Sequence, residues 1–273
     1  MNKFEGFPSM HVVSIEESKK RRESLSKKLS EYGISYKFHI FPRYYDGLYT
    51  FTNDDHLRRD MKDWANGPLT SHLLAIRDWY VNTIEPYAFF AEDDIDLSTS
   101  QYWNFTWKEF FNKLPKQWSA IQMAVIRTNY GMWEYFPQGI KLRNRFWCDW
   151  SLAGYMITRN HAEELLYHYM DGDNFRVKYC GIDRQERKEG GIWWALNANP
   201  ENIIYTLFGK YPNYIVPLFL EDIEHSSTSF NDKTSDEMLK KHGDTRRYSR
   251  KQVLGWWKKN GDKVNLDEFC NPT

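Results

Sequence analysis

The sequence predicts an α/β fold, in which strands and helices alternate along a chain of 273 residues. Short apolar or β-branched runs recur between segments whose apolar residues have helical spacing. One run, residues 87–91, is apolar and aromatic enough for a strand that is buried on both faces. The length suffices for one large domain with a substantial core.

The first half of the chain is expected to open with a β-α-β unit. Residues 10–15 form a β-branched run typical of a strand, and a helix follows from an N-cap at Ser18 to residue 30 or 31, ended by Gly33. Residues 35–41 alternate as a second strand, parallel to the first. Residues 42–66 carry turn signals and little periodicity, and residues 69–79 then predict a helix with one buried face.

The same alternation continues in the second half. Helices are expected over residues 107–114 and 160–170, and strands over 120–125, 150–157, 203–205 and 214–218. Past residue 231 the chain is polar and lysine-rich, with two expected helices and an aromatic anchor at Trp256 and Trp257. We therefore expect a domain over residues 1–230 and a helical C-terminal tail, residues 231–273, docked on it.

Composition limits the partners and the compartment. Acidic and basic residues balance at 37 each, so no overall field would attract nucleic acid or an anionic membrane. The cysteines Cys148, Cys180 and Cys270 are odd in number and widely spaced, which argues against a disulfide framework and a zinc site. Neither a signal-peptide-like segment nor a run long enough to span a bilayer is visible. We expect a cytoplasmic protein without a membrane span.

The acidic group Glu92, Asp93 and Asp94 directly follows the buried strand, with Asp96 close behind. Crowded carboxylates repel each other, and a divalent cation relieves that repulsion. Oxygen ligands suit Mg²⁺ or Mn²⁺, which complete their coordination with water and phosphates. A solvated acidic turn is the plain alternative, but the apolar run before the acids favours a metal site. Residues 221–225 form a second group of metal-capable side chains after a late strand.

A cation at the carboxyl end of a strand suggests nucleotide chemistry. Such a metal would bridge two phosphates and neutralise the charge that builds as the nucleotide leaves. If a sugar is attached, its departure creates an oxocarbenium-like carbon that an acceptor hydroxyl attacks while a carboxylate takes the proton. The high content of aromatic residues, with 12 Trp, 18 Tyr and 17 Phe, favours a ligand with flat faces.

Between about residues 10 and 230 the chain contains, in this order, the short motifs Val12-Val13-Ser14-Ile15, Ser18-x-x-Arg21-Arg22, Asp46-Gly47, Gly67-Pro68-Leu69-Thr70-Ser71-His72, Ala91-Glu92-Asp93-Asp94, Gln122-Met123 and Ala153-Gly154-Tyr155-Met156-Ile157. This order of motifs resembles glycosyltransferase family 25, which includes lipooligosaccharide and collagen galactosyltransferases. The resemblance implies a GT-A fold with a Rossmann-type mixed sheet. It also implies manganese or magnesium as cofactor and transfer of a hexose, galactose or glucose, from a UDP-sugar to a glycan or glycoconjugate with inversion.

The resemblance also implies roles for individual residues. Glu92, Asp94 and His225 would hold the metal, with Asp94 as the expected direct ligand. The residues expected near the nucleotide are Ser14, Arg21, Asp46, Gly47, Ser71, His72 and Asp93.

The acceptor side departs from the family pattern. The family commonly has an aspartate before the aromatic pair, where this chain has Gly190-Gly191-Ile192-Trp193-Trp194. Glu189 and Asp183 are the nearest carboxylates that could act as catalytic base, and Asp149 is a third candidate; each is by default a surface charge. The missing aspartate keeps a non-catalytic carbohydrate-binding protein open. A metal-dependent phosphohydrolase is another alternative.

Overall fold

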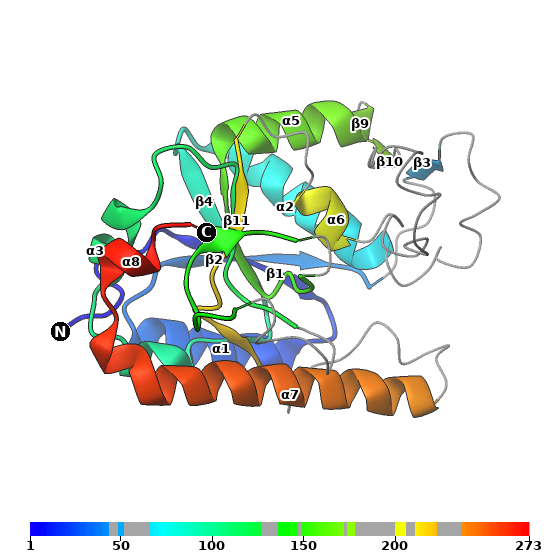
Figure 1. Ribbon diagram of the computed structural model, residues 1–273. Coiled ribbons are helices and arrows are strands. Elements are labelled where there is room, and N and C mark those ends of the chain that lie inside the picture. Colours follow the sequence, from blue (N-terminus) through cyan, green and yellow to red (C-terminus); the bar gives the residue numbers. More distant parts are fainter. Residues whose placement is uncertain are drawn as a thin grey trace, which may run out of the picture.

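A mixed sheet of seven strands forms the centre of the protein (Figure 1). The computed structural model describes residues 1–43, 49–51, 66–126, 136–146, 149–171, 174–177, 200–205, 211–222 and 236–272. The order of the strands is β2-β1-β4-β8-β6-β11-β7. They span β1 (Met10–Ile15), β2 (Tyr36–Phe41), β4 (Tyr87–Glu92), β6 (Ala120–Gln122), β7 (Arg143–Asn144), β8 (Gly154–Thr158) and β11 (Asn213–Ile215).

The directions of the strands bring the carboxyl ends of β1 and β4 to the same edge of the sheet. β1 pairs in parallel with both β2 and β4, in a register that sets Val13 opposite Glu92. β8 runs antiparallel between β4 and β6, and β11 is parallel to β6. The carboxyl ends of β1 and β4 are therefore neighbours, and the residues after each strand share one edge of the sheet.

Helices cover both faces of the sheet, which confirms the predicted α/β class. Phe89 and Phe90 are consecutive in β4 and belong to two separate core clusters, because successive side chains of a strand point to opposite faces. The cluster around Phe90 packs under α2 (Asn66–Asn82), α5 (Arg159–Tyr169) and α6 (Pro200–Ile204). The cluster around Phe89 includes residues of α1 (Lys19–Glu31), α3 (Trp107–Lys113), α7 (Asp236–Asn260) and α8 (Leu266–Phe269).

Three expected elements differ from the structure. Part of the expected irregular segment is a strand, β3 (Tyr49–Phe51), which pairs with β10 (Asn174–Val177) in a small sheet with β9 (Met170–Asp171). Residues 203–204, expected as a strand, end the helix α6; Pro200 occupies its first position, where a missing N–H is tolerated. The expected strand over 150–157 begins only at Gly154, and Ser151 before it has a φ of 118°, outside the range of strand residues.

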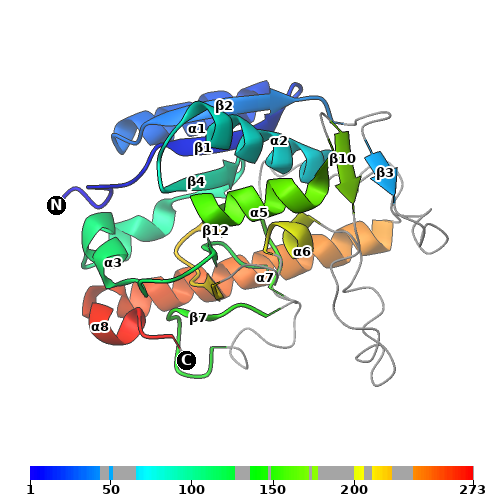
Figure 2. The same cartoon turned by 90° about the horizontal axis from the view of Figure 1, so that it is seen from above.

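The long helix α7 is docked by its C-terminal half (Figures 1 and 2). Trp257 is fully buried, and its Nε1 donates a hydrogen bond of 2.8 Å to the carbonyl oxygen of Pro217. The helix also packs on β12 (Leu220–Glu221), which pairs antiparallel with β5 (Ile95–Asp96), and on the short helices η3 (Ser98–Tyr102) and η5 (Gly261–Lys263). Among the described helices, none combines the length and apolar character needed to cross a membrane.

A buried histidine pair makes folding stability depend on pH. His11 Nδ1 lies 3.0 Å from His39 Nε2 across β1 and β2, and burial lowers the pKa of each histidine to about 4, from 6.5. The unfolded chain therefore binds more protons than the folded one between pH 6.5 and 4, so stability falls as the pH falls through this range. Between pH 7 and pH 5 we expect a loss of about 1–2 kcal/mol for each histidine.

Urea unfolding across this range compares the natural chain with the His11→Phe/His39→Phe variant. The variant should lose less stability on acidification, because it lacks the two groups that must stay neutral. Identical pH profiles for the two proteins would contradict this explanation.

Candidate functional site

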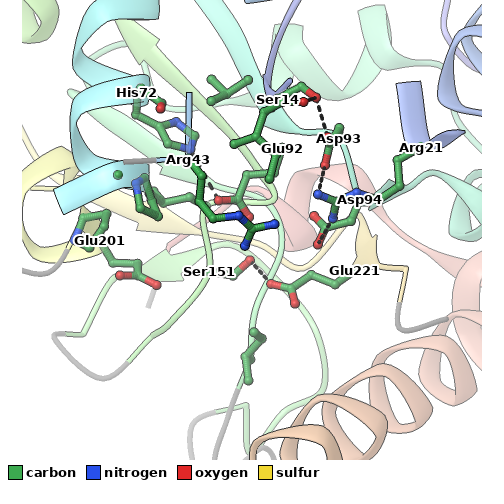
Figure 3. Close-up of a pocket in the computed structure, with 18 of the residues that line it drawn as sticks. Ser14, Arg21, Arg43, His72, Glu92, Asp93, Asp94, Ser151, Glu201 and Glu221 are labelled. Atoms are coloured by element: carbon green, nitrogen blue, oxygen red, sulfur yellow. Dashed lines mark hydrogen bonds and ion pairs between the residues drawn. The ribbon is translucent and has the colours of Figure 1, made fainter. Parts of the chain in front are cut away.

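A cavity of about 190 Å³ opens at the carboxyl ends of β1 and β4 (Figure 3). This is the edge at which open α/β sheets place their ligands. Its wall carries many ionisable side chains, which are Arg21, Arg43, His72, Glu92, Asp93, Asp94, Glu201, Glu221 and Arg246. Five are carboxylates and three are guanidinium groups, so with all acids ionised the wall carries two more negative than positive charges.

Asp93 is held in place by the first β-α connection. Ser14 Oγ, at the end of β1, donates a hydrogen bond of 2.5 Å to Asp93 Oδ2, and Arg21 Nη2, from the first turn of α1, lies 3.0 Å from Asp93 Oδ1. Burial raises the pKa of Asp93 to about 6, although Arg21 and the Ser14 hydroxyl favour the charged form. Asp93 thus orients Arg21 toward the cavity, and the basic start of α1 has an anionic partner.

Asp94 is a buried carboxylate with one oxygen that lacks a hydrogen-bond partner among the described residues. Its side chain is 7% exposed, Arg21 Nη1 lies 3.7 Å from its Oδ2, and its Oδ1 has no hydrogen-bond partner in the described part of the chain. Burial raises the pKa of Asp94, while Arg246 and Arg21 lower it. The main chain is fixed as well, because Asp222 N donates a hydrogen bond of 2.6 Å to the carbonyl oxygen of Asp94. Asp94 therefore offers a rigidly held oxygen to a ligand.

Glu92 lies next to a buried histidine. His72 Nε2 lies 3.5 Å from Glu92 Oε1, and His72 Nδ1 forms a hydrogen bond of 2.8 Å with the hydroxyl of Tyr155. Burial lowers the pKa of His72 to about 3, so the ring is neutral at pH 7. Burial and repulsion from Asp94 raise the pKa of Glu92 to about 8. The neutral ring therefore forms no ion pair with Glu92, and its Nε2 has no hydrogen-bond partner among the described residues.

Glu221 is a further carboxylate of the cavity. Ser151 Oγ donates a hydrogen bond of 2.6 Å to Glu221 Oε1, and Arg246 Nε lies 3.2 Å from Glu221 Oε2. Burial, opposed by Arg246, raises the pKa of Glu221 to about 7. The positive φ of Ser151, costly for a non-glycine residue, accompanies this contact. The sequence contained a signal for Glu221, since residues 221–225 were recognised as metal-capable.

Two further charged residues of the cavity are Arg43, which follows β2 and lies against the start of α2, and Glu201 of α6. A Cβ atom at Gly67 would lie 2.3 Å from the carbonyl oxygen of Arg43, so only glycine permits the close approach that places Arg43 on the cavity wall (Figure 3). Glu201 lines the cavity, and its side chain makes no hydrogen bond or ion pair with other described residues. The sequence around Arg43 and Glu201 did not predict a role for either residue, because each reaches the cavity only through tertiary packing.

The structure brings together the expected nucleotide-binding residues and metal ligands that it describes. The expected nucleotide-binding residues on this cavity are Ser14, Arg21, Ser71, His72 and Asp93, and the expected metal ligands on it are Glu92 and Asp94. The other expected residues, Asp46, Gly47, Asp183, Glu189 and His225, lie outside the described residues.

Asp149 does not fit its interpretation as a surface charge or as a base. Its side chain is fully buried and does not line the cavity. Arg143 binds both of its carboxylate oxygens, at 2.7 and 3.0 Å. Asp149 is one half of a structural ion pair.

The carboxylate oxygens of Asp94 and Glu92 suit a metal ion whose remaining ligands come from water and a bound substrate. Within the described ranges, no three His, Cys, Asp or Glu side chains are gathered into a preformed metal cage. Mg²⁺ sites in nucleotide enzymes usually take one or two carboxylates and complete their shell with water and phosphate oxygens. The open oxygen of Asp94, with Glu92 beside it on the same cavity, fits that arrangement.

Comparison with known proteins gives distant matches only. No protein-family model matches the chain, and no curated protein matches its sequence. Similar solved structures include A197 from STIV, with 9% identity, a TM-score of 0.35, and coverage of 78% of this chain and 84% of that chain. They also include the apo-form glycosyltransferase GlyE of Streptococcus pneumoniae TIGR4, with 10% identity, a TM-score of 0.31, and coverage of 97% of this chain and 62% of that chain. A distant structural neighbour of this chain is thus a glycosyltransferase.

Proposed function

We propose that this protein is a metal-dependent glycosyltransferase that transfers a hexose from a UDP-sugar to a hydroxyl of a glycan or glycoconjugate, with inversion. The observation that carries the proposal is the convergence of Glu92, Asp94 and Glu221 with three arginines on one cavity at the strand ends. The choice of uridine and of hexose rests on the resemblance to family 25.

The charges of the cavity favour a metal-bound diphosphate over simpler ligands. A diphosphate alone would be repelled by the carboxylates, and a cation alone by the arginines. A divalent cation on a diphosphate presents its positive charge to Asp94 and its phosphate oxygens to Arg21 and Arg43. Both kinds of side chain on the wall then meet an opposite charge.

The chain's own residues orient and stabilise the donor. Asp93 and Ser14 hold Arg21 so that its guanidinium faces the diphosphate. Glu92, next to the neutral ring of His72, would offer a second oxygen to the cation beside Asp94. When bound, Mn²⁺ or Mg²⁺ would stabilise the negative charge that develops on the leaving diphosphate.

The transfer step needs a base on the acceptor side. The acceptor oxygen forms a bond to the anomeric carbon, the bond from that carbon to the diphosphate oxygen breaks, and the hydroxyl proton passes to a carboxylate. Among the described residues Glu201 is suited to this role, since it lines the cavity without a hydrogen-bonding or ion-pair partner in that part of the chain. Glu189 and Asp183, the carboxylates nearest to the position where this chain lacks the family's aspartate, remain candidates.

Incubation with a panel of nucleotide sugars and Mn²⁺, with release of the nucleoside diphosphate as the readout, tests the proposal. We expect slow hydrolysis of one or more UDP-sugars even without an acceptor, because water can replace the hydroxyl, and no release after chelation of the metal. Saturable glycan binding without turnover would instead indicate a carbohydrate-binding protein. Release of phosphate from simple phosphoesters would indicate a phosphohydrolase.

A further inference from the structure

The C-terminal helix α7 forms part of the cavity wall, although the sequence attached no chemistry to residues 231–273. Arg246 of this helix lines the cavity. Its side chain is 21% exposed, and its Nε lies 3.2 Å from Glu221 Oε2. A segment outside the expected catalytic domain thus supplies a cation to the candidate site.

The position of Arg246 is fixed by the anchoring of its helix. Trp257 is bound to Pro217, and Val253 is also buried in the core. Arg250, one turn after Arg246 on the same side of the helix, lies 2.5 Å from Asp96 Oδ2 and donates a hydrogen bond of 2.9 Å to the carbonyl oxygen of Glu221. These contacts hold α7 against β5 and β12, so Arg246 is directed to the carboxylates rather than to bulk water.

Arg246 does more than complete an ion pair. The negative charges of Glu221, Asp94, Glu92 and Glu201 all raise the pKa of Arg246. Ser151 already donates to Glu221, so Glu221 does not depend on Arg246 alone. A guanidinium has five N–H donors in a planar fork, which lets it contact a carboxylate and a phosphate at once.

We propose that Arg246 is a diphosphate-binding residue, which donates hydrogen bonds to the phosphate next to the leaving bond. Arg21 approaches the same diphosphate from α1, and Arg246 approaches it from α7. The C-terminal helix is then an integral part of the donor site. This inference rests on the proposed function, because it takes the diphosphate of the donor as the ligand.

Calorimetric titration of pyrophosphate, UDP and UMP in the presence of Mn²⁺ tests the inference. Arg246→Gln should weaken the binding of pyrophosphate and of UDP by about tenfold or more, because hydrogen bonds to a charged ligand are lost. The affinity for UMP, which lacks the second phosphate, should change little. Arg247→Gln is the matched control, since Arg247 lies next to Arg246 on the helix, is 57% exposed and pairs with Asp244 at 2.6 Å. It should bind all three ligands like the natural chain.

The double variant Arg246→Gln/Glu221→Gln distinguishes direct contact of Arg246 with the phosphate from neutralisation of Glu221 by Arg246. It removes both members of the ion pair, and it also serves if the single variant does not fold. Weak pyrophosphate binding in the double variant supports direct contact with the ligand. Recovery of natural affinity would overturn the inference, because Arg246 would then act only by neutralising Glu221.

The natural chain distinguishes this inference from the proposed function. Binding of pyrophosphate but not UDP, with the loss in Arg246→Gln, would support a diphosphate role for Arg246 and overturn a UDP-sugar donor. Absence of pyrophosphate binding in the natural chain would overturn the role of Arg246, and the nucleotide-sugar panel would still test the enzyme independently.

Discussion

Asparagine in place of Asp94 is expected to lower metal-dependent donor hydrolysis by about 100-fold or more, since loss of a residue that merely supports a metal ligand commonly costs 10–100-fold. The asparagine keeps the shape of the side chain but removes its negative charge. The carboxylate oxygen without a partner in the described residues is then lost as a cation ligand. Manganese titration monitored by the paramagnetic signal of Mn²⁺ should show a matching fall in metal affinity.

Asp222→Asn provides the matched control for Asp94→Asn. Asp222 is joined to Asp94 through the main chain, but its side chain is 24% exposed, lies 3.8 Å from Lys28 and is not part of the cavity wall. This variant should retain both hydrolysis and metal affinity. If the two variants behave alike, or if Asp94→Asn keeps full activity, Asp94 is not the metal ligand.

Alanine in place of Asp149 is expected to destabilise the fold by about 3–5 kcal/mol, the usual cost of leaving a buried charge unpaired. Arg143 is 5% exposed and its guanidinium also lies over the rings of Phe136 and Phe146, at 4.4 and 4.9 Å. Asp149 also accepts a hydrogen bond of 2.7 Å from the backbone N–H of Phe146. Loss of the Asp149 carboxylate therefore removes the ion-pair partner of Arg143 and the hydrogen-bond acceptor of the Phe146 backbone N–H.

Urea unfolding measures this effect, with two comparisons. Asp267→Ala breaks an exposed ion pair of 2.5 Å with Lys113 and should change stability far less, because exposed ion pairs contribute little. Arg143→Met/Asp149→Leu removes both buried charges and should recover much of the loss. A small effect of Asp149→Ala on stability with a large effect on turnover would return Asp149 to the catalytic candidates.

The candidate site was visible in the sequence where it depends on one strand end. The apolar run of β4 followed by Glu92, Asp93 and Asp94 is a local pattern. Neighbouring residues alone therefore predict both the buried strand and the acidic group at its end. The β-α-β start is local as well, and Ser14 and Arg21, which the resemblance placed near the nucleotide, both line the cavity. Short-range alternation likewise predicted the α/β class.

Residues brought in by long-range packing were missed or misread. Arg246 was missed, because it meets Glu221 only when α7 docks on β12. Arg43 and Glu201 reach the cavity through the packing of α2 and α6, and β3 required a partner strand far along the chain. The buried pairing of Asp149 with Arg143 reversed its interpretation as a surface charge.

The sequence by itself determined the alternation of strands and helices and the acidic end of β4, because residue-to-residue periodicity and charge are properties of neighbouring positions. The tertiary structure alone decided which distant charges share the cavity and which are sealed in the core. That decision depends on strand register and helix docking, which bring together residues that no local pattern connects.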